Sequence, residues 1–240
     1  MKPNFFSING YLCLLALGLL SACGDEARCK KGEGSIETRT FELANLKGVK
    51  VNGSSKVYIS KGNRQRVEVR AEPNVLDDLN RDISNGIWDV ETESCFRKHE
   101  TIEVYITVPT LTHAEVNGSG EINLQNRFDV DEFKTLINGS GKIKANFTAD
   151  HAITQISGSG DAEINGIAEQ QDVSISGSGK AHTYGLATDR SLVKISGSGE
   201  AEVSVNTILE ADISGSGKIY YKGNPTVTTN ISGSGKVEKR

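Results

Sequence analysis

Serine is the residue whose spacing first suggests chemistry in this 240-residue chain, because it recurs in the triplet Gly-Ser-Gly. Some triplets precede a lysine, as in Gly139-Ser140-Gly141-Lys142, and invite comparison with a phosphate-binding loop. Such a loop needs a further glycine five residues before the Gly-Lys pair and a Ser or Thr after the lysine. Neither is present, and an aliphatic residue follows each of these lysines. The pattern therefore excludes a nucleotide site of this kind.

Catalysis by a serine nucleophile requires a histidine base and an acidic partner. The histidines are scattered, and they neither recur with the serines nor show the spacing of metal ligands. They are His99, His113, His151 and His182. We therefore expect no catalytic residue, no metal site and no cofactor, and we expect that the protein is not an enzyme.

The carboxylates offer one alternative to this expectation. If the repeats stack, Asp161 and Glu163 lie beside Glu200 and Glu202 and form an acidic patch of the kind used by β-helical enzymes of polysaccharides. Lys180 falls in the turn between the two pairs, so a solvated face of ion pairs is the preferred interpretation. A polysaccharide-cleaving β-helix is kept as a remote alternative.

The overall charge points away from nucleic acid. The chain carries 27 basic and 31 acidic residues, which gives a formal net charge of −4. Nucleic-acid binding relies on basic patches that neutralise phosphates. We therefore expect no nucleic-acid partner.

The triplet marks an internal repeat of 18 to 21 residues, and its seven copies hold 14 of the 26 glycines. Within a copy such as Ile156–Ile164, apolar or small residues alternate strictly with polar ones, which is the two-residue period of a β-strand. One such strand per repeat, stacked in register, predicts an all-β parallel β-helix of about seven Gly-Ser-Gly turns. The triplets begin at Gly118, Gly139, Gly158, Gly177, Gly197, Gly215 and Gly233.

The residue after each triplet supports the predicted register. Its charge alternates in sign through six successive turns, so stacking would place opposite charges side by side, and each such pair contributes about 0.2–1 kcal/mol. The column consists of Glu121, Lys142, Asp161, Lys180, Glu200, Lys218 and Lys236.

The polar residues on either side of the first glycine of each triplet form the candidate binding ladder, which is predicted to face solvent. Parallel β-helices in general bind extended polysaccharides along such faces. The alternative is that serine simply tolerates a crowded, solvent-facing position without promoting aggregation. The ladder consists of Asn117, Ser119, Asn138, Ser140, Ser157, Ser159, Ser176, Ser178, Ser196, Ser198, Ser214 and Ser216.

Residues 39–112 lack the triplet and contain longer alternating strands. We expect them to form a β-rich cap and the first turns at the N-terminal end of the coil, with one short helix that starts near Pro73 and has Asn74 as its N-cap. The cap and the repeats at 113–240 are expected to be one continuous domain, 39–240.

The last triplet is followed by the charged segment Lys236–Arg240 and by no comparable cap. Charged residues of this kind protect an open strand edge from unwanted pairing. The alternative is an end-to-end homodimer through the C-terminal turn.

Residues 1–22 have the pattern of a secretory signal peptide, with a basic residue near the start and an apolar run of about ten residues, which is too short to span a bilayer. The run leads into Leu20-Ser21-Ala22-Cys23, which resembles a bacterial lipobox. The resemblance implies cleavage before Cys23 and lipidation of that residue, so that the lipid anchors the protein in the membrane. An ordinary signal peptide with a coincidental cysteine is the alternative.

Residues 23–38 are polar and are expected to form a tether. Gly24 follows the cysteine where an aspartate would retain a lipoprotein in the inner membrane, so the outer membrane is expected. Asp25-Glu26 resembles the surface-export signal of Bacteroidetes lipoproteins. The predicted location is therefore the cell surface, with a periplasm-facing position as the alternative.

Two cysteines remain once the leader and the lipid-bearing cysteine are set aside. Cys29 and Cys95 would meet an oxidising compartment, where a disulfide between them would join the tether to the first part of the fold. Two free thiols are the alternative.

The repeats and the segments that precede them resemble the family called putative auto-transporter adhesin, head GIN domain, which is common in Bacteroidetes. The likeness covers about residues 39–240 and rests on the opening at Phe41–Val57, the strand at Ile102–Pro109 and the series of Val/Ile-(Asn/Ser)-Gly-Ser-Gly copies. It implies a right-handed β-helix on the cell envelope and supplies no catalytic motif.

These observations together predict a lipid-anchored binding or display protein that is adhesin-like and contacts a glycan or a surface protein. The alternative is a structural envelope scaffold without a small ligand.

Overall fold

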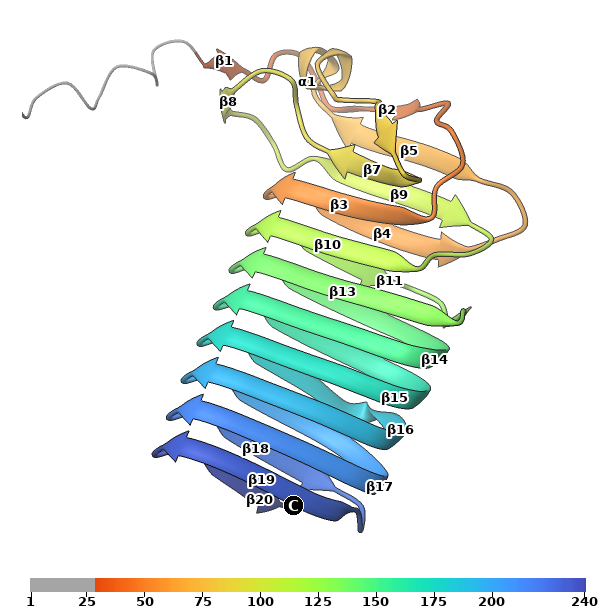
Figure 1. Ribbon diagram of the computed structural model, residues 1–240. Coiled ribbons are helices and arrows are strands. Elements are labelled where there is room, and N and C mark those ends of the chain that lie inside the picture. The colour runs from red at the N-terminus through yellow and green to blue at the C-terminus, as the bar shows by residue number, and fades with distance from the viewer. Residues whose placement is uncertain (1–28) are drawn as a thin grey trace, which may run out of the picture.

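The computed structural model describes residues 29–240 and shows a β-solenoid of about seven turns with a strand-rich N-terminal end (Figure 1). The all-β class and the parallel coil predicted from the repeat are therefore confirmed. The predicted signal peptide, the lipidation site at Cys23 and the start of the tether lie outside the described residues. Within residues 29–240, no helix has the length and apolarity needed to cross a membrane.

The N-terminal region is made of short strands and one short helix. Its elements are β1 (Lys30–Lys31), β2 (Glu37–Thr40), β3 (Gly48–Gly53), β4 (Lys56–Lys61), β5 (Arg66–Ala71), α1 (Pro73–Asp77), β6 (Ile83–Ser84), β7 (Ile87–Val90), β8 (Phe96–Lys98) and β9 (Glu103–Val108).

The coil that follows contains longer strands, several of which run through a whole turn. They are β10 (His113–Gly118), β11 (Glu121–Leu124), β12 (Phe128–Asp129), β13 (Glu132–Gly139), β14 (Lys142–Gly158), β15 (Asp161–Gly177), β16 (Lys180–Gly197), β17 (Glu200–Gly215), β18 (Lys218–Lys222), β19 (Thr226–Gly233) and β20 (Lys236–Lys239).

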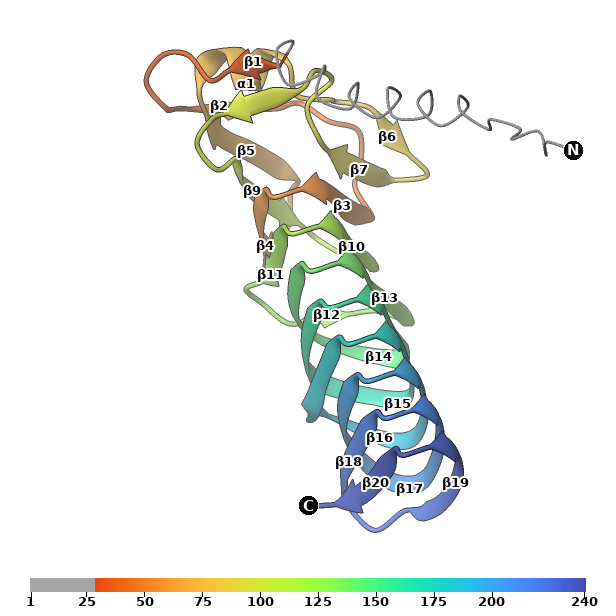
Figure 2. The same ribbon diagram turned by 90° about the vertical axis from the view of Figure 1, so that its left-hand side faces the viewer.

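Each turn runs along one sheet, passes the Gly-Ser-Gly corner and returns along a second sheet (Figure 2). We call the sheet before the corner the first sheet; it contains β3, β10, β13, β19 and the C-terminal halves of β14 to β17. The second sheet follows the corner and contains β4, β11, β18, β20 and the N-terminal halves of β14 to β17. Pairing within the coil is parallel, and equivalent residues of successive repeats are direct partners, as Gly158 is with Gly177.

The corner requires glycine for two different reasons. Gly177 has a φ of +119°, which L side chains rarely adopt, and a Cβ there would lie 2.6 Å from the carbonyl oxygen of Gly158 in the preceding turn. Gly179 points into the coil, where a Cβ would lie 2.4 Å from Cγ2 of Ile156. The composition bias toward glycine is thus a stacking requirement.

The interior is filled by aligned aliphatic columns. The residue two positions before each triplet is at most 2% exposed in the first six copies, from Val116 to Ile213. Phe133 and Phe147 stack in the interior with ring centroids 4.5 Å apart. The strict alternation predicted from the sequence therefore separates the core from the surface.

The alternating charge column is confirmed by the register, in which Lys142 is the partner of both Glu121 and Asp161. Lys142 Nζ lies 3.4 Å from Asp161 Oδ2. The alternation continues toward the N-terminus through Lys56 and Glu103, beyond the seven repeats. Neighbouring turns of the second sheet thus attract each other over most of the coil.

A deletion of one turn should reveal this contribution. Removing residues 159–177 would place Lys142 against Lys180 instead of Asp161. We expect Lys142→Gln to cost about 0.5–1 kcal/mol in the full chain, where the lysine has two acidic neighbours, and close to nothing in the deletion variant, where one neighbour is a lysine. Urea unfolding of the four proteins measures both differences, and equal losses in the two backgrounds would contradict the prediction.

The N-terminal end of the coil is closed by antiparallel strands. β9 continues the second sheet in parallel with β4, and β5 then pairs antiparallel with β9 and β2 with β5. β6 likewise pairs antiparallel with β7, which lies parallel to β3. The predicted short helix is present as α1, which packs at this end (Figure 1).

The predicted N-cap of the helix is wrong. Glu72 is the N-cap, and Pro73 occupies the first helical position, where its missing N–H costs nothing. Asn74 lies inside the helix and uses its side chain on the tether, since Oδ1 accepts the Glu33 N–H at 2.8 Å and Nδ2 donates to the Lys31 carbonyl at 2.7 Å.

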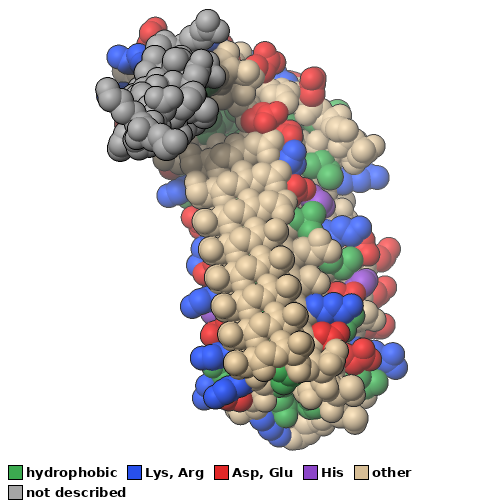
Figure 3. Space-filling model, turned by 60° about the vertical axis from the view of Figure 1, so that its left-hand side comes forward, with side chains coloured by type: hydrophobic (Ala, Val, Ile, Leu, Met, Phe, Trp, Pro, Cys, Tyr) green, Lys and Arg blue, Asp and Glu red, His purple; other side chains and the backbone are tan. Residues whose placement is uncertain are grey.

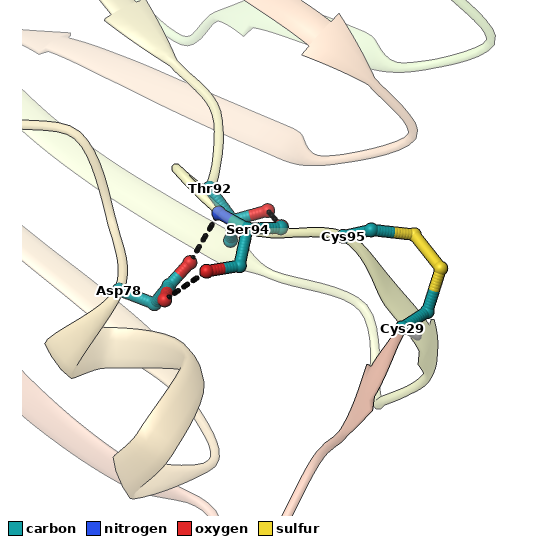
Figure 4. Close-up of a disulfide and its surroundings, with 5 residues drawn as sticks. All are labelled: Cys29, Asp78, Thr92, Ser94 and Cys95. Atoms are coloured by element: carbon teal, nitrogen blue, oxygen red, sulfur yellow. Dashed lines mark hydrogen bonds between the residues drawn. A yellow bond between two sulfur atoms is a disulfide. The ribbon is translucent and has the colours of Figure 1, made fainter. Parts of the chain in front are cut away.

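In the structure, a disulfide joins Cys29 to Cys95 (Figure 4). Next to it, Asp78 accepts hydrogen bonds from the Ser94 N–H at 2.6 Å and the Ser94 hydroxyl at 2.7 Å, and Lys30 Nζ lies 2.6 Å from the same carboxylate. Burial opposes the charged form, but these donors outweigh it and lower the pKa of Asp78. The segment that follows Cys29 is therefore held to the N-terminal end by covalent and ionic contacts.

Candidate functional site

The residues of the candidate ladder that precede each triplet lie in an unbroken column on the outer surface of the first sheet. Pairing aligns the residue before each triplet with its equivalent in the next turn, at the strand spacing of about 4.8 Å. The column consists of Asn52, Asn117, Asn138, Ser157, Ser176, Ser196, Ser214 and Ser232.

The asparagine part of this column is hydrogen-bonded to itself. Asn138 Nδ2 donates to Asn117 Oδ1 at 2.8 Å, and Asn117 Nδ2 donates to Asn52 Oδ1 at 3.0 Å. The chain of amides ends at Asp89 Oδ1, which accepts from Asn52 Nδ2 at 2.6 Å. Asn117 and Asn138 therefore join successive turns, and this role is structural.

The serine part differs from the asparagine part in its hydrogen bonding. In the described portion of the chain, none of these serine hydroxyls has a hydrogen-bond partner in the protein, and all of them are exposed. Each can both donate and accept. We call the serines of the ladder, on both sides of the first glycine of the triplets, the serine strip; it consists of Ser119, Ser140, Ser157, Ser159, Ser176, Ser178, Ser196, Ser198, Ser214 and Ser216.

Part of the serine strip lines a shallow hollow of about 600 Å³ on the first sheet. The serines that precede the first glycine of a triplet, such as Ser157, line the hollow. The serines that follow this glycine, such as Ser159, lie at the corner and do not line it. A second column of more varied side chains also lines the hollow: Leu136, Gln155, Ser174, Lys194, Asp212 and Asn230. Figure 3 shows a long uncharged surface along the coil, with charged side chains on both flanks.

Lys194 and Asp212 are the charged residues of this hollow. They are direct partners on β16 and β17, yet in residues 29–240 neither forms an ion pair. This contrasts with the second sheet, where Lys144 Nζ lies 3.3 Å from Glu163 Oε2 of the next turn. Both charges of the hollow are therefore available to a ligand, and their sum is zero.

Most carboxylates of the acidic patch considered from the sequence have a basic side chain beside them. Besides the Lys142–Asp161 pair, Glu202 Oε2 lies 2.7 Å from His182 Nδ1, and Lys180 lies between Asp161 and Glu200 in the register. A second hollow of about 400 Å³ on the second sheet is bordered by Lys142, Asp161, Glu163, His182 and Glu202. Three of the four carboxylates thus have a basic neighbour, and Glu200 forms no ion pair in the described residues.

The histidines, which showed no recognisable spacing in the sequence, bridge acidic side chains in the structure. His182 lies between Glu202 and Asp161, whose Oδ1 is 3.8 Å from Nε2, and His151 lies between Asp172 at 2.9 Å and Glu132 at 3.7 Å. The available signal was the distance along the chain, since about one repeat separates each histidine from its acidic partners. In the described residues, no group of three or more such side chains is arranged to hold a metal ion.

The second hollow lies where the regular register is interrupted. β16 contains Tyr184–Leu186, which have no partners on β17, because Thr183 pairs with Val203 and Ala187 with Ser204. The repeat that contains this bulge has 20 residues, whereas its two neighbours have 19 and 18. A long repeat thus indicated a bulge, although not what the bulge would expose.

Solved structures share this architecture. A putative adhesin from Bacteroides fragilis aligns with a TM-score of 0.79 at 17% identity, over 88% of this chain and 100% of the other. A putative adhesin from Parabacteroides distasonis aligns with a TM-score of 0.73 at 26% identity, over 88% and 99%. A putative lipid binding protein from the same species aligns with a TM-score of 0.74 at 21% identity, over 89% and 100%.

No curated protein matches the chain. The model of one protein family matches residues 45–225, which is most of the sequence and includes the N-terminal strands as well as the coil. The chain therefore belongs to the family described as putative auto-transporter adhesin, head GIN domain.

Proposed function

We propose that the protein is a lipid-anchored, adhesin-like binding protein of the cell envelope that contacts glycans through the serine strip and its hollow. The observation that carries this proposal is the hydrogen-bonding state of the ladder. The asparagine part uses its polar groups on itself, whereas the serine hydroxyls are exposed and have no protein partner.

A glycan suits this surface because both sides present hydroxyl groups that donate and accept. The strip repeats at about 4.8 Å along the coil, so an extended polymer could meet equivalent hydroxyls in successive turns. The aliphatic side chain of Leu136 at one end of the hollow offers a partner for the apolar faces of sugar rings.

Binding, rather than catalysis, fits the state of the ionisable groups. Of the four carboxylates of the patch, Asp161 and Glu163 lie beside lysines and Glu202 beside a histidine, so that only Glu200 has no ion-pair partner in the described residues. A glycosidase needs two carboxyl groups on either side of the scissile bond, one of them free to act as an acid. The family supports the same interpretation, because its members are described as adhesins.

Lysine substitutions in the hollow test the proposal. We expect Ser157→Lys and Ser176→Lys each to weaken binding to a responsive glycan at least tenfold on a glycan panel, because a long charged side chain would fill the hollow. Gln170→Lys is the matched control, since it adds the same charge at an exposed corner away from the hollow. Thermal unfolding must show that all three variants remain folded.

The glycan panel also distinguishes the proposed function from a structural scaffold and from an enzyme. Binding that the two serine variants leave unchanged would place the contact elsewhere on the coil. The absence of any glycan ligand would favour the structural scaffold, and turnover of a glycan that is lost on Asp161→Asn would favour an enzyme.

The location is tested separately by protease treatment of intact cells. We expect the protein to be cleaved from intact cells, and we expect Cys23→Ala and the double change of Asp25 and Glu26 to alanine to prevent this cleavage. Cleavage only after the outer membrane is opened would show a periplasm-facing protein and would exclude adhesion.

A further inference from the structure

The second hollow, on the second sheet, is built around the bulge of β16. Tyr184–Leu186 have no partners on β17, and Tyr184 and Gly185 line the hollow. Its volume of about 400 Å³ lies within the range of about 300–1,000 Å³ that is usual for small-molecule sites. Bulges are frequent beside functional sites because they redirect side chains out of the regular pattern. The second hollow is therefore a candidate binding site separate from the hollow of the serine strip.

Buried polar side chains hold the bulge from inside the coil. Thr183 and Thr188 flank the unpaired segment, and their hydroxyls donate to two carbonyls of β17, those of Glu202 at 2.7 Å and Ser204 at 3.0 Å. Gln171 lies between the two threonines, with its amide 3.0 Å from one hydroxyl and 3.4 Å from the other. These three polar residues are at most 1% exposed, in an interior that is otherwise mostly aliphatic. A buried network of this kind favours one conformation, so the hollow is pre-formed.

The walls of the hollow carry polar groups that the protein itself does not use. In the part of the chain that the structure describes, the Asn165 amide and the Tyr184 hydroxyl have no hydrogen-bond partner. Asp161 Oδ1 is buried and also has no hydrogen-bond partner there, because His182 Nε2 lies 3.8 Å from it. A buried oxygen without a donor is costly. A ligand that donates a hydrogen bond to Asp161 would remove this cost.

Neighbouring residues position the amide and the aromatic ring. Gly185 leaves the space that the Asn165 side chain occupies, because a Cβ at Gly185 would collide with Asn165 Oδ1. Lys222 reaches across from β18, and its Nζ lies 4.2 Å from the centroid of the Tyr184 ring. Burial, together with the charge of Glu202, raises the pKa of Tyr184, so its hydroxyl stays protonated and can both donate and accept.

The charges in and around the second hollow cancel. Farther from the hollow, Glu200 and Arg240 also act on the ionisation of Tyr184 in opposite directions. A charged ligand would therefore meet no net attraction, and the hollow suits a neutral molecule. The charged residues that line the hollow, their charged partners in the adjacent turns and Lys222 comprise four lysines and four carboxylates, with His182 neutral: Lys142, Lys144, Lys180, Lys222, Glu121, Asp161, Glu163 and Glu202.

We infer that the second hollow binds a single unit of a neutral saccharide. Sugars have adjacent hydroxyl groups, which donate to a carboxylate and form hydrogen bonds with an amide, and apolar C–H faces, which pack on an aromatic ring. The hollow brings these three kinds of partner together in Asp161, Asn165 and Tyr184. The site lies on the second sheet, so the inference goes beyond glycan contact at the serine strip and does not depend on it.

Titration with neutral monosaccharides, followed by the NMR signals of the backbone amides, tests this inference on the full exported chain. The probes are glucose, galactose and N-acetylglucosamine. We expect at least one of them to cause saturable shifts that are confined to the turns bordering the second hollow. The dissociation constant should be about 1–10 mM, because a single sugar ring makes few contacts.

Substitutions of the unpartnered groups provide the variants. Asn165→Ala and Tyr184→Phe should each weaken this binding about three- to tenfold, and both should remain folded because the groups removed have no hydrogen-bond partner in the described residues. Asp161→Asn should weaken it about tenfold or more, because it removes a charged acceptor. Asn146→Ala is the matched control, since Asn146 pairs with Asn165 in the preceding turn but does not line the hollow.

The outcomes separate this site from the serine strip. The absence of saturable shifts with all three sugars would overturn the inference, and so would binding that Asn165→Ala and Tyr184→Phe leave unchanged. Monosaccharide binding that is lost in Ser176→Lys but kept in Asn165→Ala would belong to the serine strip and would also overturn it. If Ser176→Lys leaves both monosaccharide and extended glycan binding unchanged, the proposed function of the strip fails while this inference stands.

Discussion

Replacing Gly177 with alanine is expected to destabilise the coil by about 3–5 kcal/mol, among the largest losses a single substitution can cause here. Two effects add. The φ of +119° is unfavourable for any L side chain, at a cost of about 1–3 kcal/mol. The new Cβ would also lie 2.6 Å from the carbonyl oxygen of Gly158, and this oxygen cannot move without disturbing its hydrogen bond to the Ser178 N–H.

Gly53 provides a matched control for this prediction. It has a similar φ of +105°, but no atom lies within 4 Å of the position that a Cβ would occupy. Gly53→Ala should therefore cost only the conformational part, about 1–3 kcal/mol. Urea unfolding of both variants measures the difference, and equal losses would show that stacking of the corners does not require glycine.

Removing the disulfide is expected to produce the second large effect. The bond closes a loop with a sequence separation of 66 residues, and the chain-entropy model assigns about 4 kcal/mol to a loop of this length. The stability lost should be that of the N-terminal end, because the loop contains β1 to β7 and α1. Thermal unfolding of Cys29→Ser/Cys95→Ser should therefore show an earlier transition of this end.

A single Cys95→Ser substitution is the control, because it also removes the bond and should match the double variant. Treatment of the unchanged protein with a reductant should reproduce the same shift. If the double variant unfolds at the same temperature as the unchanged protein, the contacts of Asp78 with Lys30 and Ser94 hold the segment without help from the disulfide.

The coil itself was determined by the sequence. A two-residue alternation within each repeat specifies strands, and a repeat of nearly constant length specifies that they stack in register. The pairing of the alternating charges of Glu121, Lys142 and Asp161 could be predicted from the sequence, because the register of a regular stack follows from the length of the repeat. The glycines of the corner were visible in the sequence as a repeated pattern. The structure explains them, because the backbones of successive turns approach each other too closely there for a Cβ atom.

The structure of the N-terminal end was harder to predict from the sequence, because its contacts join segments that are far apart along the chain. Asparagine is a favoured N-cap residue, but in the structure Glu72 is the N-cap and the helix begins at Pro73. The side chain of Asn74 instead forms hydrogen bonds with the tether. The antiparallel strands that close the coil contain no repeat from which their partners could be counted.

The division of the ladder was decided by the tertiary structure alone. Asn138 and Ser157 occupy the same column and look equivalent in the sequence, but an asparagine amide is long enough to reach the next turn, whereas a serine hydroxyl is not. The exposure of Ile231 was likewise not visible in its sequence pattern, because Ile195, Ile213 and Ile231 share one pattern, yet Ile231 is 41% exposed and the other two are 2% exposed. The sequence thus determined the coil and its repeating surface, and three-dimensional packing decided which parts of that surface are left without partners.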